Sequence, residues 1–233
     1  MPRMVVLCGA YNEERHLWET IPAILGQTMP DFGLLLFDNG STDGTWSLFQ
    51  DFDIDARITL MRSPRNLRCP DAMNLGMHAA LQFWPDCEWF VTAGADDLMD
   101  ADYLETILAS ADAHPDVNLI FSPMRFIDHP ERGVWTYPKY DAKRAHEALM
   151  VPGWRAFTRE LWQTVGPENT DIAGNGAGSD WEWICRASAT GMLRPYQLPE
   201  PKLSLRVRER GRTTLSDTGD RPALLRHMRA MVT

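Results

Sequence analysis

Short apolar runs alternate with segments of helical spacing over the first half of this 233-residue chain. Each run ends in small or polar residues, which is typical of a buried strand that carries polar groups at its end. The runs cover residues 4–8, 33–37, 57–61 and 89–91. Between them, apolar residues recur at helical spacing, as in Leu17, Ile21 and Ile24. A β-α-β-α-β-α-β order at this rhythm predicts an α/β fold, with a mostly parallel sheet and helices on both faces.

The first predicted helix has two features that bear on its boundaries. Asn12 is the expected N-cap, because its side-chain oxygen can accept a hydrogen bond from the first turn. Pro22 lies inside the same helix and predicts a kink or an early break, because proline removes a helical hydrogen bond. Further helices are expected over residues 71–83 and, after the fourth strand, through Leu104 and Ile107.

The rhythm changes beyond residue 113, where the predicted elements become shorter and the loops longer. Residues 126–140 are irregular and are expected to hold a hairpin, and residues 169–179 form a glycine-rich loop. Residues 206–220 are polar and are expected to be mobile. The remaining predictions are strands at residues 117–121, 153–157 and 203–207, and helices at residues 159–165, 180–190 and 222–231.

The charge and the cysteine content exclude several classes of function. The formal net charge is −9, which argues against a protein that binds nucleic acid through bulk positive charge. The four cysteines show no spacing typical of a zinc site or a redox pair, so a reducing, cytoplasmic location is expected. No apolar run is long enough to span a bilayer, and no transmembrane segment is predicted.

Residues 88–102 combine a buried strand with two adjacent acids. The apolar run is followed by the small residues Ala93, Gly94 and Ala95 and then by Asp96 and Asp97. In open α/β sheets, ligands bind at the carboxyl ends of the strands. Adjacent carboxylates suit a hard cation with oxygen ligands, such as Mg²⁺ or Mn²⁺. Taken alone, the same acids are equally well explained as the start of the next helix, where Asp is favoured.

Four ordered segments resemble family 2 glycosyltransferases with the GT-A fold. In residues 5–45, a strand, a Tyr-Asn-Glu turn, a helix, a second strand and the run DNGSTDGT stand in the family's order. The other segments lie around Asn74, at residues 88–102, and at residues 178–183, which read GSDWEW. The resemblance implies a single GT-A domain, a Rossmann-like α/β fold that binds nucleoside-diphosphate sugars. Its implied parts are a nucleotide-sugar-binding half (residues 1–112), an acceptor-binding half (113–205) and a mobile basic tail with a C-terminal helix (206–233).

The resemblance implies a nucleotide site at the ends of the first two strands. Asp38 corresponds to the family residue that hydrogen-bonds the base, and the alternative is an acid that only stabilises its own turn. Ala10, Tyr11 and Glu13 stand where the family lines the base and the ribose, although Tyr11 also fits plain packing. Arg68 lies where some relatives place an arginine against the base or phosphate, and the alternative is a solvated loop cation.

The resemblance assigns the acidic stretch to a metal and diphosphate site. Asp96 and Asp97 resemble the second and third acids of the family's Asp-x-Asp-Asp pattern, and Gly94 replaces the first. Asp96 is therefore expected beside the ribose or the metal, and Asp97 as a direct ligand of Mn²⁺ or Mg²⁺. Such a metal would neutralise charge on the departing diphosphate.

The late acidic motif implies the catalytic base. Asp180 follows the glycine-rich loop, and it is expected to take a proton from the acceptor hydroxyl in an inverting transfer. The alternative is an acid that only stabilises the start of a helix. Glu182 is the second candidate base. Trp181 and Trp183 are expected either to form a sugar-stacking wall or to pack in the core.

A run of arginines follows the last predicted strand. Arg206 and Arg208 stand where relatives carry an Arg-x-His pair, so Arg208 replaces the histidine. Arg208, Arg210 and Arg212 are expected to clamp the diphosphate when the tail closes. Arginine cannot serve as the neutral metal ligand that histidine provides. The alternative is a solvated basic tail.

Together the motifs imply an inverting, metal-dependent glycosyltransferase that moves a sugar from a nucleoside-diphosphate sugar, with UDP- or dTDP-sugars favoured, to an acceptor hydroxyl. The acceptor is expected to be a saccharide or to be lipid-linked, and residues 126–150 are expected to shape its site. The basic helix at residues 222–231 allows peripheral contact with the inner membrane face. The rival interpretations are a non-catalytic sugar-nucleotide-binding protein, motivated by Gly94 and Arg208, and a nucleotidyltransferase. The oligomeric state is left open.

Overall fold

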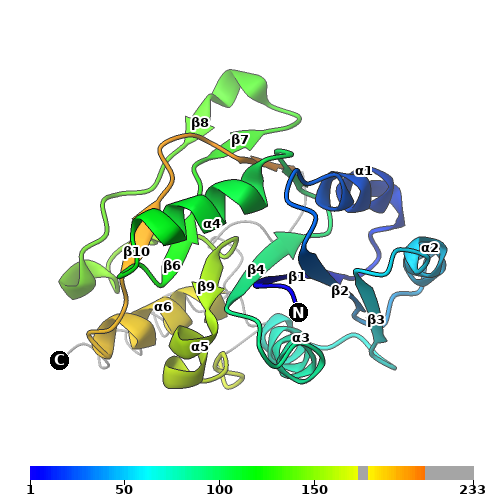
Figure 1. Cartoon of the computed structure of the whole chain (residues 1–233), viewed down its shortest axis with the longest axis horizontal. Coiled ribbons are helices and arrows are strands. Elements are labelled where there is room, and N and C mark those ends of the chain that lie inside the picture. The colour runs from blue at the N-terminus through cyan, green and yellow to red at the C-terminus, as the bar shows by residue number, and fades with distance from the viewer. Residues whose placement is uncertain (173–177, 208–233) are drawn as a thin grey trace.

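The computed structural model describes residues 1–172 and 178–207, and a seven-stranded sheet forms its centre (Figure 1). The strand order is β10-β6-β9-β4-β1-β2-β3. All neighbouring pairs are parallel except those of β9, which runs antiparallel to β4 and β6. This sheet confirms the predicted α/β fold. Its strands are β1 (Met4–Ala10), β2 (Phe32–Asp38), β3 (Ile58–Arg62), β4 (Trp89–Gly94), β6 (Leu119–Phe121), β9 (Ala156–Thr158) and β10 (Pro195–Gln197).

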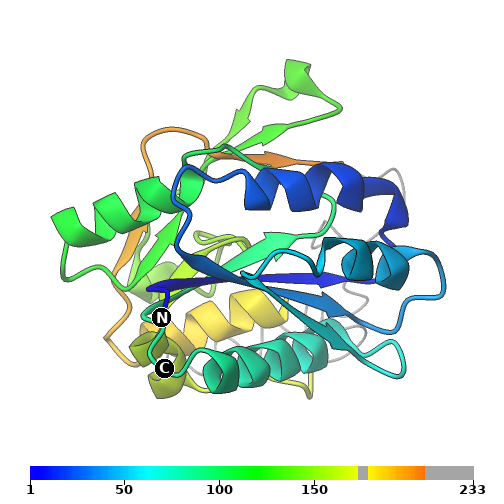
Figure 2. The same ribbon diagram turned by 45° about the vertical axis from the view of Figure 1, so that its right-hand side comes forward.

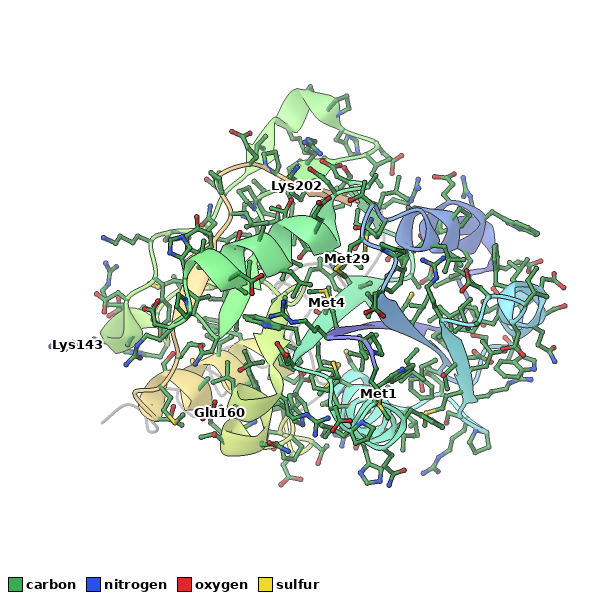
Figure 3. All side chains as sticks on the ribbon, in the orientation of Figure 1. Met1, Met4, Met29, Lys143, Glu160 and Lys202 are labelled. Atoms are coloured by element: carbon green, nitrogen blue, oxygen red, sulfur yellow. The ribbon has the colours of Figure 1, made fainter. Side chains whose placement is uncertain are left out.

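Helices cover both faces of this sheet, as Figure 2 shows for α1 on one side and α3 and α6 on the other. Side chains alternate along β1, so Val6 packs with α1, α2 and α4, whereas Val5 packs with α3, α5 and α6. Met4, labelled in Figure 3, is fully buried in the first of these layers. The helices are α1 (Glu14–Leu25), α2 (Thr45–Phe52), α3 (Cys69–Phe83), α4 (Tyr103–Ala113), α5 (Arg159–Val165) and α6 (Ser179–Ala189).

The start of α1 corrects one prediction, because Asn12 is not its N-cap. Glu13 occupies that position without a capping bond from its side chain, and the Asp43 carboxylate accepts from the N–H of Glu14 at 3.2 Å. Asn12 has a positive φ of 56°, a conformation that asparagine tolerates better than most residues. Its Oδ1 accepts a hydrogen bond from the backbone N–H of Thr42 at 2.8 Å. The side chain therefore joins two loops at the edge of the sheet instead of closing a helical turn.

Pro22 does not break α1, which continues to Leu25. The proline is exposed, so water can reach the carbonyl that its missing N–H leaves without a helical partner. Gly26 then ends the helix, and its backbone N–H donates to the Pro22 carbonyl at 2.8 Å. The prediction of an early break was wrong because it ignored this solvent-facing position.

A second, four-stranded sheet has the order β5-β11-β7-β8. β7 and β8 pair antiparallel, which confirms the hairpin expected in this region. β11 pairs with β5 and β7, so the end of the described chain lies beside the acidic stretch (Figure 1). The sequence did not predict β5, because two residues are too few for a periodic pattern. The strands are β5 (Leu98–Met99), β7 (Met124–Phe126), β8 (Val134–Trp135) and β11 (Leu203–Leu205).

Most other predicted elements are present with ends shifted by one to three residues. The predicted tail and final helix lie outside the described residues, apart from residues 206 and 207. Within the described ranges, no helix has both the length and the apolar character needed to cross a membrane.

Candidate active site

The carboxyl ends of β1, β2 and β4 meet at one edge of the sheet, because Ala10 pairs with Asp38 and Gly9 pairs with Gly94. Asp38 is fully buried, and its Oδ1 accepts a hydrogen bond from the backbone N–H of Ser41 at 2.9 Å. Arg62 Nε lies 2.9 Å from Oδ2 as an ion pair. Its N–H is not aligned with this oxygen, and Oδ2 has no hydrogen-bond donor among the described residues. Oδ2 is buried beside this guanidinium, so a ligand N–H can reach it only if the Arg62 side chain moves away.

A cleft of about 480 Å³ opens beside Asp38. This volume lies within the range of small-molecule sites. Gly40 turns the chain here with a φ of 75°, and a side chain at this position would collide with the backbone of Arg65. The guanidinium of Arg62 lies 5.2 Å from the ring of Trp46. The cleft is lined by Gly40, Ser41, Thr42, Arg62, Ser63 and Pro64.

Three of the other predicted donor residues follow β1 at the same edge. Ala10 accepts a hydrogen bond from the backbone N–H of Asn39 at 2.8 Å, and Tyr11 follows it half-buried. The buried Glu13 donates its backbone N–H to Thr45 Oγ1 at 2.9 Å.

Arg68 begins α3, where its Nε pairs with Asp71 at 2.9 Å and its side chain is 42% exposed. The preceding Leu67 donates its backbone N–H to Asn39 Oδ1 at 3.0 Å, so the start of α3 lies next to the end of β2. Arg62, which the sequence did not single out, is the arginine that lines the cleft.

The Cys8 thiol near the end of β1 reports on the acids around it. Burial and, to a smaller extent, the charges of Asp96, Glu13 and Asp97 together raise its pKa to about 12. Asp97 is buried, and its Oδ1 accepts a hydrogen bond from the backbone N–H of Arg206 at 2.9 Å.

Arg206 ties the end of the chain to this acidic stretch. Its Nε donates to the carbonyl of Asp96 at 3.1 Å, and its Nη2 lies 3.0 Å from the Glu19 carboxylate. The side chain is only 14% exposed. The sequence placed Arg206 within the family's Arg-x-His segment but assigned the donor contact to Arg208, which lies outside the described residues with Arg210 and Arg212.

Gly94 is a glycine for a steric reason. A Cβ at this position would lie 2.5 Å from Asp97 Oδ2 and 2.6 Å from the indole of Trp154. Trp154 comes from the segment before β9, far away in the sequence. The indole therefore occupies the space that the side chain of a first acid would need.

The donor set suits a hard divalent cation held largely by a diphosphate. Mg²⁺ and similar ions are commonly bound through one or two carboxylates together with substrate phosphates and water. Asp96 and Asp97 supply two carboxylates. Within the described residues, no three His, Cys, Asp or Glu side chains are grouped as metal ligands. The chemistry of the two acids therefore fits a cation that binds together with its nucleotide.

Asp180 is the second residue of α6 and is partly exposed. Its Oδ1 accepts a hydrogen bond from the backbone N–H of Trp181 at 2.8 Å. Its Oδ2 lies 2.8 Å from where a Cβ on Gly153 would stand. Thr92 of β4 donates its hydroxyl to the Gly153 carbonyl at 2.8 Å. Gly153 thus lies beside Asp180, and the Trp154 indole and Asp97 lie on the same side of Gly94.

The neighbours of Asp180 on α6 face the interior. Trp181 and Trp183 are 1% and 0% exposed, so they are core residues, and the sugar-stacking wall is excluded. Glu182 is also buried, and its carboxylate pairs with Arg186 Nε at 2.8 Å. Asp180 is the more accessible of the two candidate bases.

Solved structures with this fold include proteins bound to nucleotide sugars. S. aureus TarS in complex with UDP-GlcNAc matches with a TM-score of 0.78 and 16% identity, over 99% of this chain and 66% of that chain. The mannosyltransferase PcManGT from Pyrobaculum calidifontis, in complex with GDP-Man and Mn²⁺, matches with a TM-score of 0.70 and 23% identity, over 90% and 58% of the two chains. These matches establish the fold class, which is the GT-A fold of nucleotide-sugar transferases.

Sequence comparison identifies the family. The model of glycosyl transferase family 2 matches residues 6–179, so the chain belongs to this family of enzymes. A "PGL/p-HBAD biosynthesis glycosyltransferase" from Mycobacterium bovis is 29% identical over 199 residues, covering 82% of this chain and 72% of that protein. An "Uncharacterized glycosyltransferase" from Haemophilus influenzae is 25% identical over 134 residues, covering 57% of this chain but 40% of that protein. The chain therefore spans less than half the length of this second relative.

Proposed function

We propose that the chain is an inverting glycosyltransferase that transfers a sugar from a nucleoside-diphosphate sugar to an acceptor hydroxyl, with Mn²⁺ or Mg²⁺ bound at Asp96 and Asp97. The observation that carries this proposal is the buried Asp38, paired with the cleft-lining Arg62, on the sheet edge that also holds the two acids. In this assignment residues 1–112 bind the donor and residues 113–205 bind the acceptor.

The donor base is held by Asp38. An imide N–H of uracil or thymine is a suitable donor for Asp38 Oδ2 once the Arg62 side chain moves away, which favours UDP- or dTDP-sugars. Ala10, Tyr11 and Glu13 border this position at the end of β1. The bound cation would supply charge neutralisation for the departing diphosphate.

Asp180 is the proposed general base. It takes the proton of the acceptor hydroxyl as the oxygen attacks the anomeric carbon of the donor sugar, and the bond from that carbon to the diphosphate breaks. The buried ion pair of Glu182 makes that residue unsuitable for the same role.

The acceptor is proposed to be a saccharide or a lipid-linked molecule that binds near the hairpin of β7 and β8. Trp135 is 38% exposed and stacks with Tyr137 at a centroid distance of 5.4 Å. Burial raises the pKa of the Tyr137 hydroxyl, and the charge of Asp180 adds to this effect. Tyr137, which stacks with Trp135, therefore lies close enough to Asp180 for the charge of the proposed base to act on it.

A thermal-shift panel tests the donor site. UDP, dTDP and GDP, each with and without Mn²⁺, are added to the wild type and to Asp97→Ala. UDP or dTDP with Mn²⁺ is expected to raise the melting temperature of the wild type only. If no nucleotide raises it, the donor site is wrongly assigned. Nucleotide binding without release of UDP from UDP-sugars would favour a non-catalytic binding protein, and pyrophosphate release from a nucleoside triphosphate would favour a nucleotidyltransferase.

A further inference from the structure

Asn74 on α3 lies in one of the four family segments of the sequence, and the proposed function gives its side chain no role. Its amide makes two hydrogen bonds to a single residue on a distant segment. Nδ2 donates to the carbonyl of Glu168 at 2.9 Å, and Oδ1 accepts from the backbone N–H of Glu168 at 2.8 Å. The two residues lie 94 positions apart in the chain. Asn74 therefore fixes the backbone of Glu168 to a helix of the proposed donor half.

The buried side chain of Glu168 extends this connection to α6. Its Oε2 accepts a hydrogen bond from the hydroxyl of Ser179 at 2.8 Å. Ser179 is the first residue of α6, is itself buried, and directly precedes Asp180. Glu168 Oε1 lies 3.8 Å from Nη2 of the buried Arg155, so both oxygens of the carboxylate have a partner. Because buried hydrogen bonds are electrostatically stronger than exposed ones, Glu168 ties the start of α6 firmly to α3.

The N-cap residue of α6 does not stabilise the first turn of the helix through a side chain. Gly178 occupies that position, and a glycine has no side-chain oxygen that could accept from the first backbone N–H groups. One turn further on, Trp183 Nε1 donates to the Gly166 carbonyl at 2.9 Å, which holds the later part of the helix. The hydrogen bond between Ser179 and Glu168 acts directly before the proposed base, so its loss is expected to loosen the segment that carries this base.

The beginning of α3 contacts the proposed nucleotide site. Just before the helix, the backbone N–H of Leu67 donates to Asn39 Oδ1, and the Leu67 carbonyl accepts from Asn39 Nδ2, both at 3.0 Å. Asn39 directly follows Asp38 at the end of β2. Asn74 lies about two helical turns after Leu67. The donor edge of the sheet and the start of α6 are therefore connected to the same helix.

We propose that Asn74 and Glu168 are positioning residues of the candidate active site, which hold the start of α6 so that Asp180 faces the donor at the edge of the sheet. This inference rests on the proposed role of Asp180 as the base. Each residue acts through the next one, from Asn74 to Glu168 and from Glu168 to Ser179. A base must lie within hydrogen-bonding reach of the proton that it takes, and a displacement of about 1 Å can cost about 10²-fold in rate. Loss of either link therefore slows the transfer while the donor site stays intact.

Amide hydrogen exchange tests this connection without catalysis. Peptides from the first turns of α6 and from α4 are followed by mass spectrometry in the wild type, Asn74→Ala, Ser179→Ala and Glu168→Ala. Each variant is expected to raise the exchange rate at the start of α6 about tenfold and to leave α4 unchanged, because it removes hydrogen bonds that hold this segment. Ser179→Ala leaves the pair of Glu168 with Arg155 intact, so the test stands whether or not Glu168→Ala folds. An unchanged rate in Asn74→Ala or Ser179→Ala overturns the proposal.

Asn118→Ala is the matched control for Asn74→Ala. The Asn118 amide also bridges two backbone groups, since it donates to the Met192 carbonyl and accepts from the Arg194 N–H, both at 2.8 Å. These contacts lie beyond the other end of α6, so Asn118→Ala loosens the fold at a different place. An equal rise at the start of α6 in Asn118→Ala would show general destabilisation and would contradict the positioning role.

The kinetics of donor hydrolysis provide the second readout. Release of UDP from UDP-GlcNAc in the presence of Mn²⁺ gives kcat, and calorimetry gives the Kd for UDP. Asn74→Ala and Ser179→Ala are expected to lower kcat about 10- to 10²-fold without changing the Kd. Glu168→Gln keeps an oxygen that accepts from Ser179 and is expected to retain most of the wild-type kcat. Glu160→Gln, which changes an exposed acid on α5 (Figure 3), controls for the loss of a charge.

Two kinetic results would refute the positioning role. One is a wild-type kcat in both alanine variants, and the other is an equal loss of kcat and of affinity for UDP. Absence of hydrolysis in every protein, together with faster exchange at the start of α6, would instead place the failure in the proposed function.

Discussion

Asp97 and Asp180 are the two acids on which the proposed chemistry depends, and their surroundings differ in kind. Asp97 is confined by shape, because Gly94, the indole of Trp154 and the backbone of Arg206 leave it little room. Asp180 packs on Gly153 and follows Ser179, whose hydroxyl donates to the buried Glu168 of a charge cluster with Arg155. Steric confinement is insensitive to pH, whereas a charge cluster responds to each proton it gains or loses. The same segment, residues 153–155, contributes to both environments.

Asp180→Asn should have the largest effect on activity. Loss of the general base is expected to reduce kcat by about 10²- to 10⁴-fold, with little change in the affinity for UDP. Initial rates of UDP release and calorimetric titration with UDP measure the two quantities. A variant with a wild-type rate would make Asp180 only a helix-start acid. Asp116→Asn controls for the loss of one negative charge.

The buried Glu168, which accepts a hydrogen bond from Ser179 next to Asp180, is expected to make the stability of the fold depend on pH. Its pKa is about 7 in the folded chain against a reference of 4.5. Between these values the folded chain retains a proton that the unfolded chain has released, so the free energy of unfolding falls as pH rises through this window. The difference between the two pKa values, about 2.5 units, corresponds to a change of about 3.5 kcal/mol in the free energy of unfolding, at about 1.4 kcal/mol per unit.

Urea unfolding at pH 5 and pH 8 measures this dependence. The difference in the free energy of unfolding between the two pH values is expected to shrink in Glu168→Gln and to persist in Glu160→Gln. Equal differences in the wild type and Glu168→Gln would show that Glu168 titrates normally in the folded chain.

Gly94→Ala tests whether the space beside Asp97 is limited by steric contact. The added methyl group overlaps Asp97 Oδ2 and Trp154, and overpacking of this kind costs about 1–3 kcal/mol of stability. Gly9→Ala is the matched control, because Gly9 pairs with Gly94 on the neighbouring strand and has no atom within 4 Å of the added Cβ. Thermal unfolding compares the two variants. Trp154→Leu combined with Gly94→Ala should recover part of the loss, and additive losses would argue against the indole as the obstacle.

Asp38→Asn is expected to act on donor binding and not on the chemical step. It keeps the size of the side chain but weakens acceptance from the donor base and breaks the ion pair with Arg62. Removal of one hydrogen bond to a charged group costs about 1.5–3 kcal/mol, which is roughly 10- to 150-fold in the Kd for UDP. Calorimetry with UDP measures it, with Asp31→Asn, an exposed acid before β2, as control. Unchanged affinity would leave Asp38 as a turn acid.

Much of the fold was predictable because it follows from the local spacing of apolar residues. The strands β1, β2 and β4 and the helices α3 and α4 follow from apolar spacing within a few residues of their observed ends. Asn12 and Pro22 were misjudged because their outcomes depend on a loop and on solvent that lie outside the local pattern.

The candidate site was predictable only where it lies directly after a strand. Asp38, Asp96 and Asp97 are visible as polar residues that follow apolar runs. Trp154 and Arg155 precede a short strand in a stretch without periodicity. Only the position of Trp154 beside Gly94 and the ion pair of Arg155 with Glu168 link them to the site.

The sequence by itself determined the family, the mostly parallel sheet and the acids at its edge, because strand alternation and strand-end motifs are local properties of the chain. The tertiary structure decided why Gly94 has no side chain, where Arg206 binds, and that residue 153 lies beside β4. These contacts join residues about 60 to 110 positions apart. Steric exclusion and electrostatic coupling depend on distance in space, which no local pattern contains.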